Sequence, residues 1–171
     1  MKKLILFVVL LLSFNFAKAQ DIFTAIRNNQ LVEVQKHLQA GVDINAVNAR
    51  GTTPLILAVY NNQADIVKLL IEKGANLNAQ DKSGNNALMG ATFKAYPEMV
   101  KILIDKGANV NQVNYNGAST LIFAATFGQS KIAEILLQKN ADINIADKTG
   151  KTALDHAKLQ ENKEMIVLLS K

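Results

Sequence analysis

Two histidines and fourteen carboxylates are the side chains of this 171-residue chain that could carry acid–base chemistry or hold a metal. His37 and His156 lie far apart in the sequence. His156 follows Asp155 directly, but adjacent residues on a helix point away from each other, so we expect no dyad between them. The chain has no cysteine, which excludes thiol catalysis, thiolate metal sites and a lipid anchor on cysteine. It also has no G-x-S-x-G, H-E-x-x-H or phosphate-binding glycine loop.

The carboxylates that draw notice have structural explanations. One group sits where turns favour an Asx residue, because its side chain binds nearby backbone amides. A second group sits near expected helix starts, where the helix dipole favours negative charge. The turn group is Asp43, Asp81, Asp142 and Asp147, and the helix group is Asp65, Glu98 and Glu134. We therefore expect no catalytic, cofactor-binding or metal site and no enzyme activity.

The N-terminal segment has the composition of a secretory signal. Lys2 and Lys3 precede an unbroken apolar run from Leu4 to Leu12, and Ala17-Lys18-Ala19 supplies small residues for a signal peptidase. The apolar run is shorter than the roughly 20 residues that a membrane span needs. We expect a signal peptide at residues 1–19, cleavage after Ala19, and no stable membrane insertion afterwards.

The net charge argues against a nucleic-acid partner. Loss of Lys2, Lys3 and Lys18 from the 19 basic residues leaves 16 against 14 acidic ones, a net charge of +2. No run of five like charges occurs, and a nucleic-acid binder would show a concentrated basic stripe. We expect a protein partner, no nucleic acid, and a monomer.

Four glycines recur at a spacing of 33 residues after the signal: Gly51, Gly84, Gly117 and Gly150. Each follows an Asx-containing turn and precedes a Leu-x-x-Ala pattern, which puts two apolar residues on one helix face. Thr53-Pro54 is the best helix start, a capping residue followed by proline at the first helical position. A second helix follows in each unit and ends near Gly74, Gly107 or Asn140, residues that suit a helix C-terminus. A period of this size indicates stacked repeats.

Helix, turn, helix and projecting hairpin within 33 residues, with G-x-T-P-L-x-x-A, V-x-x-L-L and G-A-D/N-x-N, resemble the ankyrin repeat over residues 20–171. The resemblance implies an all-α ankyrin-repeat solenoid. Its expected units are 20–50 (an N-terminal cap), 51–83, 84–116, 117–149 and 150–171 (a C-terminal cap). The ankyrin histidine after T-P-L is replaced by Ile56, Met89, Ile122 and Asp155, so we expect apolar contacts in place of a polar network in the middle three units.

The residues that the repeat pattern leaves free are the candidates for function. In an ankyrin stack, partners usually meet the hairpin tips and the outward face of the first helices, which form a concave groove. Aromatic residues with basic neighbours are a common interface composition. The candidate partner-binding residues are Arg50, Tyr60, Lys82, Phe93, Lys94, Tyr115, Asn116, Phe127, Lys148 and Lys151. The alternative is that one or two of these aromatics pack between units.

The predicted function is a non-enzymatic protein-interaction module that is exported, and is periplasmic if the source is Gram-negative and secreted otherwise. The groove would then bind a protein partner with acidic features. One alternative is a secreted effector or an antitoxin-like inhibitor of another cell's protein. Another is an accessory factor of an envelope enzyme or a weak hydrolase, which would need converging titratable residues that the sequence does not offer.

Overall fold

The structure, a computed structural model, describes residues 21–170. The predicted signal peptide lies outside the described residues. The chain divides into two compact units, Met1–Ala75 and Asn76–Lys171. Each unit is described by itself.

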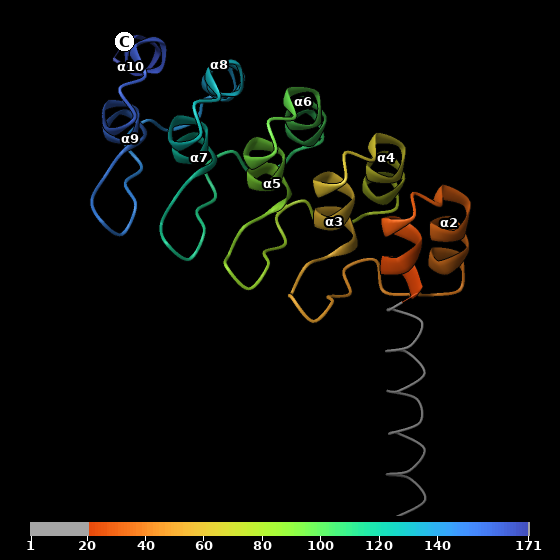
Figure 1. The fold of residues 1–171 in the computed structure, drawn as a ribbon. Helices are drawn as coiled ribbons and strands as arrows, with labels where there is room; N and C mark the ends of the chain where they lie inside the picture. Colours follow the sequence, from red (N-terminus) through yellow and green to blue (C-terminus); the bar gives the residue numbers. More distant parts are fainter. Residues whose placement is uncertain (1–20, 171) are drawn as a thin grey trace, which may run out of the picture. The chain divides into compact units, whose positions relative to one another are not determined.

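Both units are built from pairs of short antiparallel helices joined by turns (Figure 1). In the first unit, residues 21–27 are helical and precede three further helices. These are α2 (Leu31–Gln39), α3 (Pro54–Tyr60) and α4 (Ala64–Glu72). The second unit contains α5 (Ala87–Phe93), α6 (Pro97–Asp105), α7 (Thr120–Thr126), α8 (Ser130–Gln138), α9 (Ala153–Leu159) and α10 (Lys163–Leu169).

The first helices α3, α5, α7 and α9 each begin at a side chain that caps them. Thr53, Asn86, Ser119 and Thr152 each accept a hydrogen bond from the backbone amide three residues later. Such a bond satisfies one of the amides that the first turn of a helix leaves without a partner. The Thr53-Pro54 start expected from the sequence is therefore confirmed.

The helices end in residues with left-handed backbone. Gly74, Gly107 and Asn140 follow the second helices and have φ of +88°, +96° and +60°. The turns after the first helices use Asn62, Ala95, Gly128 and Glu161 in the same conformation. Glycine and asparagine adopt it easily, whereas Ala95 (φ +55°) adopts it at a cost of about 1–2 kcal/mol.

In the second unit the helices form two layers. The first-helix layer, α5, α7 and α9, carries the hairpin loops, and the second-helix layer, α6, α8 and α10, lies behind it (Figure 1). The core between the layers is aliphatic, and Leu88, Leu103 and Leu136 are fully buried. The described residues contain isolated antiparallel bridges at the hairpins, such as Val113 with Ser119, and no longer strand. The all-α repeat fold expected from the sequence is confirmed.

At the position of the ankyrin histidine, the middle three repeats have a buried apolar residue, as expected, and the last repeat has an aspartate. Ile56, Met89 and Ile122 are at most 2% exposed, so they join the apolar core of their own unit. Asp155 instead forms a capping box, in which its side chain accepts a bond from the Thr152 amide while Thr152 accepts one from the Asp155 amide. The bond from the Thr152 amide is the main reason that the pKa of Asp155 is lowered.

A chain of amide side chains links consecutive hairpins in the second unit. Asn86 is fully buried, and its Nδ2 donates to Gln112 Oε1 at 3.1 Å. Gln112 Nε2 in turn donates to the Asn78 carbonyl at 3.0 Å. Asn114 Nδ2 also donates to Asn85 Oδ1, at 2.9 Å. These bonds hold the hairpin after α6 in register with the one before α5.

Replacing Asn86 with alanine should therefore cost more than loss of a cap alone. The cap contributes about 1 kcal/mol, and leaving Gln112 Oε1 without its donor adds about 1 kcal/mol. We expect a loss of about 2 kcal/mol in the free energy of unfolding, measured by urea denaturation. Ser119→Ala is the matched control, because Ser119 caps α7 through one bond and should cost about 1 kcal/mol. Equal losses in the two variants would show that the amide chain contributes nothing.

Candidate functional site

The predicted partner-binding residues fall on both units. Arg50 and Tyr60 belong to the first unit, and the other eight belong to the second. Arg50 is exposed and lines a hollow of about 290 Å³ together with Arg27 and Leu57, whereas Tyr60 is half-buried at the end of α3. Lys82, Lys94, Asn116 and Lys148 are exposed, and Lys151 is half-buried.

Two of the predicted aromatics meet directly. The Phe93 and Phe127 rings have centroids 5.0 Å apart and an interplanar angle of 83°, an edge-to-face contact. Phe123, half-buried on α7, adds a third ring 5.9 Å from that of Phe127. We call Phe93, Phe123 and Phe127 the phenylalanine cluster. Phe93 and Phe127 are still 47% and 45% exposed, so the rings join neighbouring repeats and keep a free apolar surface.

Tyr115 packs against the preceding hairpin. An alanine Cβ at Gly84 would overlap the Tyr115 amide nitrogen and come within 2.6 Å of Tyr115 Cδ1. The Tyr115 amide donates to the Ser83 carbonyl at 3.2 Å. Because its side chain is 57% exposed, Tyr115 both joins two hairpins and presents a ring to solvent. The alternative that some aromatics pack between units is therefore correct in part.

The next pair of hairpins is joined in the same way. The Lys148 amide donates to the Asn116 carbonyl at 2.9 Å, one repeat after the bond between Tyr115 and Ser83. Lys151 Nζ donates to Thr149 Oγ1 at 3.2 Å. Backbone bonds between hairpins thus hold Tyr115, Asn116 and Lys148 in a row of turns.

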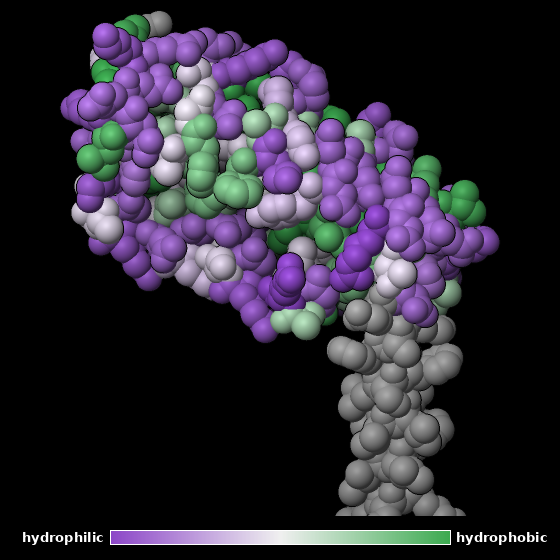
Figure 2. Space-filling view, viewed as in Figure 1, coloured by the Kyte–Doolittle hydropathy of each residue, from purple (hydrophilic) through white to green (hydrophobic). Residues whose placement is uncertain are grey.

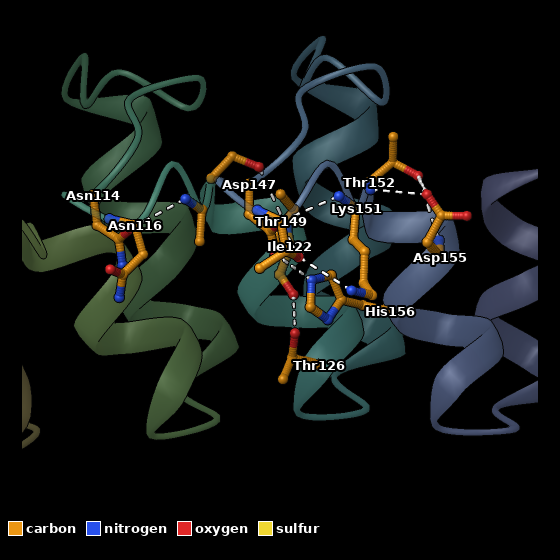
Figure 3. Close-up of polar contacts among 12 residues, drawn as sticks. Asn114, Asn116, Ile122, Thr126, Asp147, Thr149, Lys151, Thr152, Asp155 and His156 are labelled. Atoms are coloured by element: carbon orange, nitrogen blue, oxygen red, sulfur yellow. Dashed lines mark hydrogen bonds and ion pairs between the residues drawn. The ribbon is translucent and has the colours of Figure 1, made fainter.

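An Asp–His pair that the sequence did not predict lies beside this row (Figure 3). His156 Nε2 on α9 is 2.7 Å from Asp147 Oδ2 in the preceding hairpin, and the two side chains are 19% and 11% exposed. Asp147 Oδ1 also accepts bonds from the Thr149 hydroxyl at 2.6 Å and from the amides of Thr149 and Lys151. The Thr149 hydroxyl first and His156 second hold the pKa of Asp147 well below its usual range.

This pair ties α9 to its own hairpin and gives a structural reason for His156. The expectation that Asp155 and His156 form no dyad holds, since Asp155 is bonded to Thr152. His156 stands at the repeat position of Leu57, Gly90 and Phe123, so the pair with Asp147 has no counterpart in the other repeats.

Comparison with protein-family models gives the family of these units. Residues 22–114 match a model of ankyrin repeats in three copies, and residues 103–157 match a second model of ankyrin repeats in many copies. The chain belongs to the ankyrin-repeat family. Ankyrin repeats are typically non-enzymatic protein–protein interaction modules. Comparison with curated proteins gave no significant match.

Hydrophilic atoms dominate the visible face, and pale and green atoms gather in the middle of the unit that ends with α10 (Figure 2). Between residues 21 and 170, no group of three or more acidic or histidine side chains is placed to hold a metal ion. No helix in the same range is long and apolar enough to cross a membrane. A hollow of about 540 Å³ lies between α8 and α10, and no predicted partner-binding residue lines it.

Proposed function

We propose that this ankyrin-repeat protein is an exported, non-enzymatic module that binds a protein partner through the hairpin tips and first helices, the family's concave groove. The observation that carries the proposal is the exposure of aromatic rings on that side: Phe93, Tyr115 and Phe127 are each 45–57% open to solvent. Single exposed apolar residues are common, but contiguous exposed apolar patches mark interaction surfaces, and Phe93 and Phe127 are in contact. Aromatic residues are also the residue types that dominate interface energies.

Export rests on residues 1–19 and is tested separately from binding. Expression of the whole chain in a Gram-negative host, followed by mass spectrometry of the product, should show loss of residues 1–19 and a periplasmic location. An uncleaved product in the cytoplasm would contradict export. Recovery from the culture fluid would favour the secreted effector or inhibitor over a periplasmic protein.

The binding surface is tested once a partner has been captured by crosslinking in the cell envelope. Alanine at Phe93 or Tyr115 should each weaken the complex about tenfold or more, because truncating a central interface aromatic costs about 2 kcal/mol or more. Alanine at Tyr60 tests whether the first unit takes part. Affinity is measured by titration calorimetry, and circular dichroism checks folding. Unchanged affinity in all three folded variants would rule out this surface.

A further inference from the structure

The phenylalanine cluster joins two repeats and is partly open to solvent. Phe93 ends α5, Phe123 lies on α7 and Phe127 directly follows α7. The ring centroids of Phe93 and Phe127 are 5.0 Å apart and those of Phe123 and Phe127 are 5.9 Å apart, so the rings form one apolar surface across two repeats. Nearly half of Phe93 and of Phe127 remains open to solvent. On α9, one repeat after α7, Leu159 occupies the repeat position of Phe93 and is 62% exposed.

The hairpin tips and first helices of the second unit carry more positive than negative charge. Residues 81–94, 114–127 and 147–160 hold five lysines and three aspartates. All three aspartates accept amides of their own turn or helix start: Asp81 from Ser83 and Asn85, Asp147 from Thr149 and Lys151, and Asp155 from Thr152. The side chains of Lys94 and Lys148 make no ion pair with a carboxylate of the described residues.

Two lysines behind this side form ion pairs. Lys101 pairs with Glu98 at 2.9 Å on α6, and Lys139, which follows α8, pairs with Asp105 of α6 at 2.9 Å. Among the described residues of the second unit, the ion pairs between lysine and a carboxylate thus lie on the second-helix layer. Lys94, the residue that directly follows Phe93 at the end of α5, is exposed and has no such partner. The positive charge of Lys94 therefore lies next to the apolar surface of the phenylalanine cluster, so one ligand could contact the charge and the rings together.

We propose that the phenylalanine cluster and Lys94 form a docking site for an acidic segment of a protein partner, with one large apolar side chain set on the rings and flanking Asp or Glu residues facing Lys94 and Lys148. This inference rests on the proposed function, because it names the partner's chemistry at the same surface. The apolar side chain gains by covering the open parts of the rings. The carboxylates complement the net positive charge of this side of the unit.

The length of the segment follows from the helix. α7 has seven residues and spans about 10 Å from its hairpin to Phe127. Extended chain covers about 3.3 Å per residue, so about three residues separate the carboxylate near the hairpin from the apolar anchor. A peptide of about twelve residues is long enough to satisfy both ends.

The test is selection of twelve-residue peptides from a phage-displayed library on the purified chain, followed by fluorescence anisotropy with one synthetic peptide from the enriched set. We expect enrichment of peptides that combine Phe, Leu, Ile or Trp with Asp or Glu. Phe127→Ala and Phe93→Ala should each weaken binding at least tenfold. Lys94→Glu should weaken it at least fivefold and reduce its dependence on salt. If Phe127→Ala fails to fold, the affinity is measured instead with Phe127→Leu, which keeps an apolar side chain but removes the ring.

The controls lie on the second-helix layer. Lys106 follows α6 as Lys94 follows α5, and Val167 on α10 is 65% exposed. Lys106→Glu and Val167→Ser should leave the affinity unchanged. Absence of enrichment, enriched peptides without acidic residues, or equal loss in Lys106→Glu and Lys94→Glu would each overturn the docking site. If an envelope partner still binds a chain with Phe93→Ala and Phe127→Ala, this inference fails while the proposed function stands.

Discussion

Alanine at Gly84 is expected to destabilise the second unit by about 2–5 kcal/mol. Two costs combine there. Gly84 has φ of +79°, where a residue with a Cβ is strained by about 1–2 kcal/mol. The new Cβ would also overlap the Tyr115 backbone, and overpacking of this kind adds about 1–3 kcal/mol. Because the obstacle is backbone, rotation of a side chain does not relieve it.

Gly150→Ala separates the two costs. Gly150 has nearly the same φ, +78°, but nothing lies within 4 Å of the position of its Cβ. We expect it to lose about 1–2 kcal/mol, the backbone strain alone. Both variants are measured by urea denaturation with fluorescence of the tyrosines as the probe. Equal losses would mean that the contact between Gly84 and Tyr115 carries no energy, and that Tyr115 does not join the two hairpins.

Asparagine at position 147 is expected to lower the free energy of unfolding by about 1–2 kcal/mol at pH 7. The turn itself tolerates asparagine, since Asn48 and Asn114 occupy the same repeat position and accept the same two amides. What Asp147→Asn removes is the charge that strengthens the bonds to the Thr149 hydroxyl and to His156. Asp81→Asn is the matched control, because the position of His156 is held by Gly90 in that unit.

The effect of Asp147 has a defined pH dependence. Its folded pKa lies below the unfolded value of about 3.9, so its contribution is fully present above about pH 4 and is lost as the pH falls through the folded pKa. The difference in the free energy of unfolding between wild type and Asp147→Asn should therefore narrow as the pH falls below about 4. Urea denaturation at several pH values measures it. A gap that widens in acid would contradict the assigned bonds.

The repeat pattern was sufficient to predict the helix pairs. Thr53 and Pro54 mark a helix start by their own chemistry, and Gly74 and Gly107 mark ends because few residues adopt a left-handed backbone. These are local effects, and they recur every 33 residues. Burial of Ile56, Met89 and Ile122 also followed from their repeat positions.

The candidate site was predictable in composition and not in contacts. Phe93 and Phe127 do not occupy equivalent repeat positions but differ by one. Their ring contact therefore depends on how α5 and α7 pack against each other, and the sequence does not give that packing. The same holds for Tyr115, whose approach to Ser83 depends on the spacing of two hairpins. The bond between Asp147 and His156 joins a turn to a helix, and adjacent-residue reasoning about Asp155 and His156 could not reveal it.

Two backbone bonds between hairpin tips make it possible to measure how cooperatively the repeats of the second unit separate. The Tyr115 and Lys148 amides each donate across one repeat boundary, and neither bond belongs to a helix. Separation of two hairpins therefore exposes one of these amides to exchange with solvent even while the helices stay intact. Similar exchange rates for the two would mean that the repeats open together. A faster rate at Lys148 would mean that the chain unzips from the α10 end, one repeat at a time.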